Sequence, residues 1–219
     1  GKKDKAAVER IFAYVMKLTT AIAFVFFISA SCFPRGLMRI FTDEQPLIDG
    51  GAVYLRTVSL SFLLTGISQL YLCALKNCGK AGKSSIISST SVAVNLVLNA
   101  VLIFGLFGIP RMEIAGAALA TVLSRVIEVA WCILETAQKD SVKLRLHNII
   151  HDDKLLRRDF WKYTSPVLGN EIVWGVGFTM YSVIMGHLGS DAVAANSIAN
   201  IAKNLIACFC LGVASGGGI

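Results

Sequence analysis

Long apolar stretches are the feature that most constrains this chain: there are six, and five of them are consistent in length with crossing a lipid bilayer. The clearest, residues 84–110, holds 27 consecutive residues without Asp, Glu, Lys or Arg, while 57–75 and 172–190 hold 19 each and 18–34 holds 17. A hydrocarbon core about 30 Å thick requires roughly 20 apolar residues per helix. These lengths predict transmembrane helices, and they limit the chain to functions carried out in or across a membrane.

Composition excludes the other fold classes. The chain is 55% hydrophobic with a mean hydropathy of +0.65, whereas soluble domains are about 45–50% apolar. Backbone groups in lipid must bond within the structure, which allows only helices and closed barrels. Because a barrel would show short alternating segments, the sequence predicts an all-α polytopic bundle of about six transmembrane helices.

Basic residues gather in alternate connections between these stretches. Residues 1–17, 76–83 and 138–163 together carry fifteen Lys and Arg, while the other connections carry only four, namely Arg35, Arg39, Arg56 and Arg111. The positive-inside rule assigns the basic segments to the cytoplasm, so we expect a multi-pass protein of the plasma or inner membrane. Because these charges border apolar spans, they predict contact with membrane lipids and no nucleic-acid partner.

One polar segment divides the chain. Residues 138–160 are basic with interleaved apolar positions, as in an interfacial amphipathic helix. This cytoplasmic linker separates residues 1–137, with four spans, from residues 161–219, with two. The chain begins in a basic loop without Met and stops at the end of a span, so we expect it to be part of a longer protein.

Patterns typical of metal sites and enzymes are weak in this sequence. The six cysteines form no CxxC pair, and they suit small apolar packing positions in helices. His147 and His151 have the spacing of a zinc-binding helix, but Asn148 replaces the glutamate of that motif. The spans hold no nucleophile–base pair. We therefore predict no metal, no cofactor and no enzyme activity.

Glu171 is the residue with the strongest functional signal. It lies about ten residues into the fifth predicted span, 160–185, and no basic residue occupies the positions three or four residues away. A carboxylate at mid-membrane must face protein, water or a bound cation. Glu171 is therefore predicted to bind a coupling cation, Na⁺ or H⁺; the alternative is a buried glutamate that pairs with another helix, for example with Lys203.

Other polar residues also fall inside spans. Arg125 and Glu128, at i and i+3, are predicted to form an ion pair that is either structural or part of opening and closing a transport path. A further set either lines a cavity or bonds helix to helix. Its members are Asn95, Asn99, Asn170, Asn200, Lys203 and Asn204.

Several stretches together resemble the multidrug and toxic compound extrusion (MATE) family of transporters. They are IFTD at 40–43, YLR at 54–56, NLVLNAVLIFG at 95–105, GAALAT at 116–121, SRVIE at 124–128, PVLGNEIVW at 166–174 and AANSIA at 194–199. They occur in the family's order and spacing over nearly the whole chain. The family's fold has twelve helices in two lobes. This chain resembles helices three to eight, which form part of each lobe.

The resemblance implies a function. Family members exchange Na⁺ or H⁺ for amphipathic or cationic organic compounds by alternating access, and the resemblance places Glu171 at the family's seventh-helix carboxylate. Some members carry a further acid one turn later, where this chain has Gly175. A flippase for lipid-linked precursors or polysaccharides, from the same superfamily, is the alternative function. The residues indicate no oligomeric state.

Overall fold

The computed structural model describes residues 5–108, 110–136 and 154–217. Residues 138–153 of the predicted linker, with His147 and His151, lie outside the described residues. Seven α-helices and one short 3₁₀ helix make up the described part, without any strand. The helices are α1 (Lys5–Cys32), α2 (Pro34–Phe41), α3 (Gln45–Asn77), α4 (Ala81–Phe104), η1 (Leu106–Gly108), α5 (Glu113–Thr136), α7 (Lys154–His187) and α8 (Ser190–Gly217).

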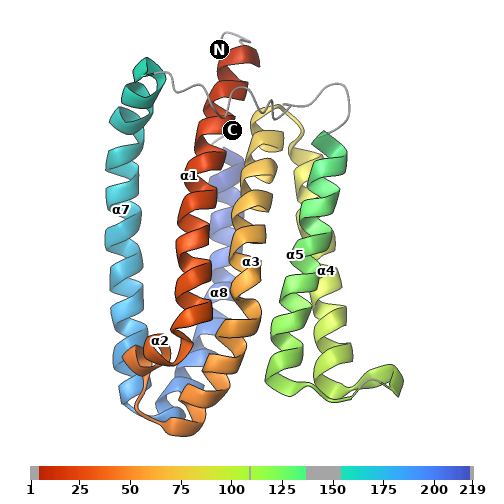
Figure 1. Cartoon of the computed structure of the whole chain (residues 1–219), viewed down its shortest axis with the longest axis vertical. Coiled ribbons are helices and arrows are strands. Elements are labelled where there is room, and N and C mark those ends of the chain that lie inside the picture. The colour runs from red at the N-terminus through yellow and green to blue at the C-terminus, as the bar shows by residue number, and fades with distance from the viewer. Residues whose placement is uncertain (1–4, 109, 137–153, 218–219) are drawn as a thin grey trace.

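The long helices run alternately up and down, as Figure 1 shows. Helices α1, α3, α4, α5 and α7 are each long and apolar enough to cross a membrane. Helix α8 is also long, at 28 residues, but it is not among those five in the described part of the chain. The prediction of an all-α polytopic membrane bundle is confirmed.

Two helix boundaries differ clearly from the predicted spans. Helix α3 starts at Gln45, twelve residues before the apolar stretch 57–75, and has Pro46 in its first turn. Helix α7 starts at Lys154, so that residues 154–160 of the predicted linker form its first two turns. A search for apolar runs does not detect polar residues at the ends of a helix, although these residues continue its backbone hydrogen bonds.

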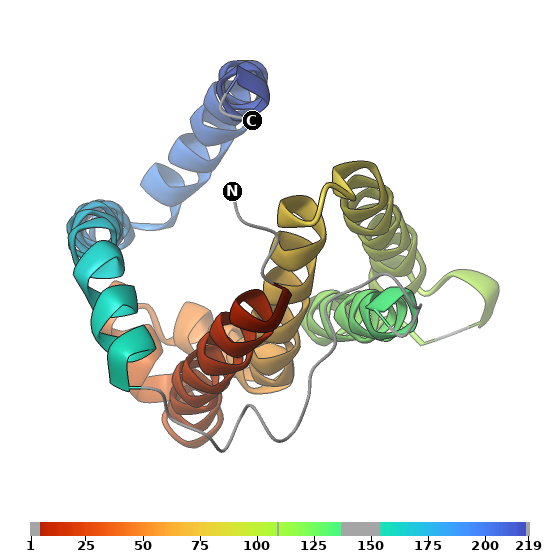
Figure 2. The same ribbon diagram turned by 90° about the horizontal axis from the view of Figure 1, so that it is seen from above.

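Helices α1, α3, α4 and α5 form a packed unit. A cluster of buried side chains from all four helices lies at its centre, made of Phe12, Tyr71, Leu72, Leu75, Ile87 and Cys132. Viewed from above, these helices stand together while α7 and α8 continue an open arc (Figure 2). No described side chain of α7 or α8 is buried, so the surfaces of these two helices are available to lipid, ligands or further helices.

Gly116 sets how closely α4 and α5 approach. A Cβ added at this position would lie 2.8 Å from the Leu102 carbonyl oxygen, which also accepts a hydrogen bond from the Met112 amide. In lipid, helix association depends on such close packing of small residues. The backbone oxygen cannot move aside like a side chain, so an added side chain must push the helices apart.

Gly116→Val is therefore expected to destabilise the protein by about 1–3 kcal/mol, measured as a lowered thermal midpoint in detergent. Gly82→Val is the matched control, because it also lies in a helix and nothing lies within 4 Å of an added Cβ there. Equal midpoints for the two variants would contradict the close-packing role.

Candidate functional site

Glu171 lies at the middle of α7, 17 residues after Lys154 and 16 before His187. At a rise of 1.5 Å per residue, each end of the helix is roughly 25 Å away. The side chain is exposed. Within the described part of the chain it makes no hydrogen bond or ion pair, so its carboxylate is available to a bound cation or to water.

A groove runs between α7 and α8 next to this carboxylate. Its volume is about 690 Å³, and its lining residues are Val173, Trp174, Gly177, Phe178, Tyr181, Asn196, Ala199, Asn200 and Lys203. Glu171 is not among them, but it precedes Trp174 by three residues and Phe178 by seven. Positions with this spacing share one face of a helix, so Glu171 continues the groove-lining face of α7.

Hydrogen bonds and ring contacts order the groove. The Tyr181 hydroxyl donates to the Asn196 side-chain oxygen at 2.8 Å. Trp174 and Phe178 stack with ring centroids 5.7 Å apart and an interplanar angle of 13°. The Lys203 ammonium lies 5.7 Å from the centroid of the Phe178 ring, and within the described residues no ion pair joins it to Glu171. Lys203 thus contacts an aromatic ring instead of the carboxylate suggested as its partner.

The predicted polar set is divided between two places. Asn200 and Lys203 line the α7–α8 groove, whereas Asn170 and Asn204 are exposed and lie outside its lining. Asn95 and Asn99 are on α4, where the Asn99 amide donates to the Asn95 side-chain oxygen at 3.0 Å. These residues therefore do not form a single cluster.

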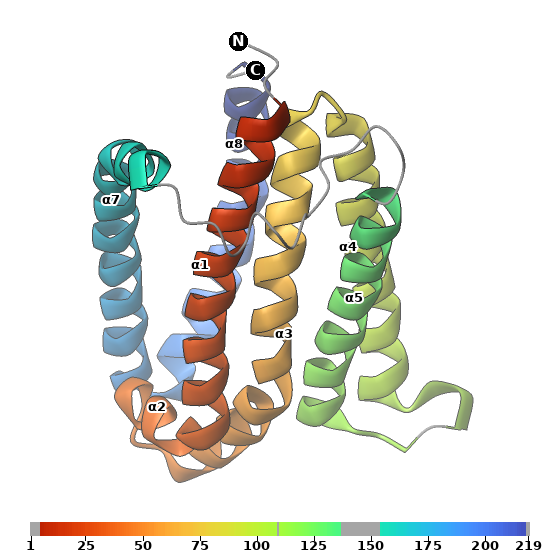
Figure 3. The same cartoon turned by 45° about the horizontal axis from the view of Figure 1, so that its top comes forward.

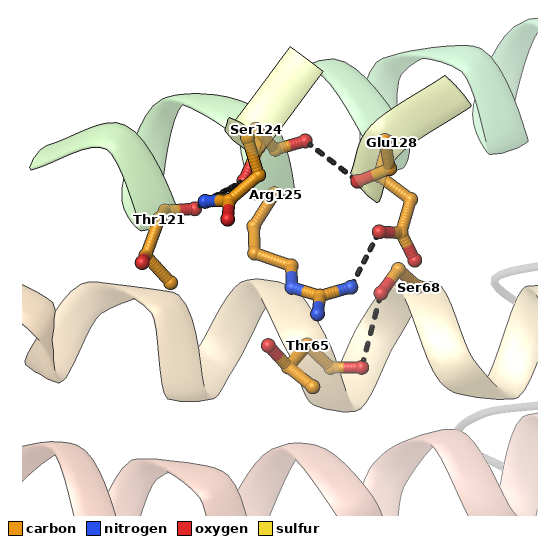
Figure 4. A network of polar contacts seen from close by, with 8 residues as sticks. Thr65, Ser68, Thr121, Ser124, Arg125 and Glu128 are labelled. Carbon is orange, nitrogen blue, oxygen red and sulfur yellow. Dashed lines mark hydrogen bonds and ion pairs between the residues drawn. The ribbon is translucent and has the colours of Figure 1, made fainter. Parts of the chain in front are cut away.

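Asn95 belongs to a polar network between α4 and α5 (Figure 4). Its amide donates to the Ser124 hydroxyl at 3.3 Å, and that hydroxyl donates to the Thr121 carbonyl at 2.9 Å. The Ser91 hydroxyl donates to the Ser124 carbonyl at 3.3 Å. In this structure Asn95 bonds one helix to another, which was one of its two predicted roles.

Arg125 and Glu128 form an ion pair on α5 (Figure 4). The Glu128 side chain is 0% exposed and that of Arg125 is 28% exposed. Only one carboxylate oxygen contacts Arg125, and the other, Oε1, is buried without a partner in the described residues. A buried charge with so few partners depends strongly on the one cation beside it.

Two contacts that hold helices together were not predicted from the sequence. Lys83, in the first turn of α4, pairs with Glu135 near the end of α5. Trp161 of α7 donates through its indole nitrogen to the Tyr14 hydroxyl of α1 at 3.1 Å, and the Tyr14 and Phe160 rings meet edge to face. Helix direction alone places Lys83 and Glu135 at the same membrane face, which is the signal that could have paired them.

At its other end α7 contacts α2 (Figure 3), close to the turn that joins α2 to α3. The Ser190 amide donates to a Glu44 carboxylate oxygen at 3.2 Å, and His187 Nε2 lies 3.6 Å from Asp43 Oδ2. A Cβ added at Gly186 would lie 2.0 Å from the Phe41 carbonyl oxygen. Helix α7 is therefore joined to α1 at one end and to α2 and the following turn at the other, and no such contact is made by Glu171 in its middle.

Comparisons with known proteins agree on one family. The MatE family model matches residues 1–101. The chain is 24% identical over 163 residues to the probable multidrug resistance protein NorM of Thermotoga maritima, covering 74% of this chain and 35% of that protein. It is 23% identical over 204 residues to the probable multidrug resistance protein YoeA of Bacillus subtilis, covering 91% and 44%.

A third relative, the probable multidrug resistance protein NorM of Pseudomonas aeruginosa, is 28% identical over 171 residues, covering 75% of this chain and 34% of that protein. The chain thus spans between about a third and under a half of the length of these relatives. No solved structure is significantly similar to it. The described residues also contain no group of three or more His, Cys, Asp or Glu that could hold a metal ion.

Proposed function

We propose that this chain, which matches the MatE family model over residues 1–101 and resembles probable multidrug resistance proteins over 74–91% of its length, is a MATE-type transporter and forms part of a cation-coupled antiporter. The antiporter exports amphipathic or cationic organic compounds in exchange for Na⁺ or H⁺. Relatives described as multidrug resistance proteins support export of such compounds. The single observation that carries the coupling is Glu171, an unpaired carboxylate at the middle of α7 within the described residues.

Coupling requires that the carboxylate alternate between two states. With a cation bound, Glu171 presents no net charge to the apolar middle of the membrane; without it, the charge must face water or protein. Each state therefore favours a different surrounding of α7. A ligand shifts a conformational equilibrium only through such a difference in binding free energy between the two states.

Contacts at the two ends of α7 support alternating access as the mechanism. One end holds Tyr14 against Phe160 and Trp161, and the other holds Asp43 and Glu44 against His187 and Ser190. In transporters of this kind one half rocks against the other around a fixed site. Opening towards one side of the membrane would separate one set of contacts while the other set acts as the pivot.

Orientation follows from the charges. The start of α1, the turn before α4 and the start of α7 lie at one end of the bundle (Figure 1). We assign this end to the cytoplasm of a cell membrane, in line with the positive-inside rule. The end that holds Asp43, Glu44 and His187 then faces outward.

The proposal is tested with the longer protein in proteoliposomes. A Na⁺ gradient at constant pH is imposed in one arm and a pH gradient without Na⁺ in the other, and ethidium movement is followed by fluorescence. One of the two gradients is expected to drive ethidium against its own gradient, and the arm that does so identifies the coupling ion. If neither gradient moves ethidium, the proposed function is wrong.

A further inference from the structure

Resting on the proposed transport function, we propose that the groove between α7 and α8 binds flat aromatic compounds that carry a negative charge. This substrate class differs from the amphipathic cations that Glu171 alone would favour. Three properties of the groove carry the inference: its aromatic wall, its cation and its open floor.

The aromatic wall is formed by Trp174 and Phe178. Their rings are stacked, and the two residues remain 70% and 49% exposed. A flat ligand ring laid against Trp174, the more exposed of the two, would extend an existing stack. Offset or edge-to-face aromatic contacts add to the free energy of burying the ring itself.

The cation is Lys203, the charged residue among those that line the groove. It lies 13 residues after the start of α8 and 14 before its end, roughly 20 Å from either end at 1.5 Å per residue. An ammonium at this depth is costly without an anion or water beside it. A ligand carboxylate or sulfonate would supply a charge-assisted hydrogen bond, while Asn200 offers a neutral polar contact nearby.

The position of Lys203 along α8 also indicates which kind of anion can reach it, a lipid headgroup or a small compound. Lipid phosphates lie at the headgroup level, which is well separated from the middle of a core about 30 Å thick. A compact amphipathic anion can reach the middle of the groove, whereas a lipid headgroup in its bilayer position cannot. The inferred ligand is therefore a small aromatic acid.

The open floor is formed by Gly177. Nothing lies within 4 Å of a Cβ added at this position, although it lines the groove between the aromatic wall of α7 and Ala199 of α8. The groove volume of about 690 Å³ falls within the roughly 300–1,000 Å³ of small-molecule sites. A larger side chain at Gly177 would fill ligand space without a clash inside the described protein.

Binding is measured with three probes that share one ring system: pyrenebutyrate, the neutral pyrenebutanol and a pyrene amine. Each is titrated into the purified longer protein in detergent, and energy transfer from tryptophan to pyrene reports binding. Lys203→Met is expected to weaken pyrenebutyrate about tenfold, or about 1.4 kcal/mol, and to leave pyrenebutanol unchanged. Lys203→Arg keeps the charge and should retain most of the pyrenebutyrate affinity.

Filling the groove gives an independent arm. Gly177→Leu is expected to weaken all three probes about tenfold or more. Gly212→Leu is its control, because it also lies on a helix with nothing within 4 Å of an added Cβ and it does not line the groove. Equal pyrenebutyrate binding by Lys203→Met and the parent protein, or equal effects of the two leucine variants, would overturn the proposal.

Two outcomes separate this inference from the function on which it rests. If gradient-driven ethidium export is present but pyrenebutyrate binding does not depend on Lys203, only the groove proposal is wrong. If another helix of the longer protein occupies the groove, Gly177→Leu will lower the thermal midpoint relative to Gly212→Leu and the parent protein will not bind pyrenebutyrate, which also overturns it. Absence of ethidium export together with Lys203-dependent binding contradicts the antiport function.

Discussion

Glu171→Gln in the longer protein is expected to abolish the dependence of export on an ion gradient. The amide has nearly the shape of the carboxylate, but it cannot be neutralised by a proton or a Na⁺ ion, so the two states of α7 no longer differ in charge. Coupling free energies between two ligands are typically about 1–3 kcal/mol, or roughly 5–150-fold. We expect the gradient-driven export rate to fall by a factor in that range.

The stability of this variant should stay close to that of the parent protein, because Glu171 is exposed and makes no hydrogen bond or ion pair within the described residues. Glu171→Asp, which keeps the charge, should retain a gradient response. Asp191→Asn is a matched control, since it removes an exposed acid from the first turn of α8. Export by Glu171→Gln at the parent rate would remove the physical basis of the coupling proposal.

The transmembrane helices were predictable because the signal is local. The apolar run from 57 to 75 lies within α3, and most of the runs from 84 to 110 and from 172 to 190 lies in α4 and α7. The cost of burying backbone and charge in lipid leaves few alternatives for such runs. Contacts within one helix were equally accessible: the spacing of Arg125 and Glu128, and of Asn95 and Asn99, brings their side chains together by helix geometry alone.

Contacts between distant segments could not be predicted in the same way. Trp161 and Tyr14 are separated by 147 positions, and Ser190 and Glu44 by 146. The sequence pattern of one segment contains no information about its partner segment, because the pairing depends on how α7 packs against α1 and α2. The α7–α8 groove has the same origin: Asn200 and Lys203 were singled out as polar, but their placement opposite Trp174 and Phe178 requires the packing of two helices.

Glu128 shows a third case, in which the pair was predictable but its burial was not. Helix α5 packs against α3 and α4, and the Glu128 side chain is 0% exposed in this packing. Its Oε1 has no partner in the described residues. Apolar residues surround all faces of a membrane helix, so hydropathy alone does not tell the lipid-facing side from the packed side. Because Glu128 is buried, a substitution that breaks its ion pair is expected to lower stability strongly and not slightly.

Arg125→Met is expected to be the most destabilising single substitution considered for this chain. Among the described residues, Arg125 is the cation that contacts Glu128, and its loss leaves a fully buried carboxylate uncompensated. Breaking a buried pair in this way costs about 3–5 kcal/mol. For a protein of this size each kcal/mol lowers the thermal midpoint by roughly 2–4 °C, so the midpoint measured in detergent should fall by roughly 6–20 °C.

Two controls give this prediction its specificity. Arg35→Met breaks the exposed pair with Asp49, whose side chains are 73% and 58% exposed, and exposed pairs contribute only about 0–1 kcal/mol. The double variant Arg125→Met with Glu128→Leu removes both charges and should recover most of the lost stability, because replacing a whole buried pair with apolar residues is often neutral or stabilising. A loss for Arg125→Met no larger than that for Arg35→Met, or a double variant no more stable than Arg125→Met, would show that Glu128 does not depend on its neighbour. Glu171→Gln is expected to impair coupling without lowering stability, whereas Arg125→Met is expected to lower stability through Glu128. We therefore expect Glu128 to support the packed helices, and we propose that Glu171 binds the coupling ion.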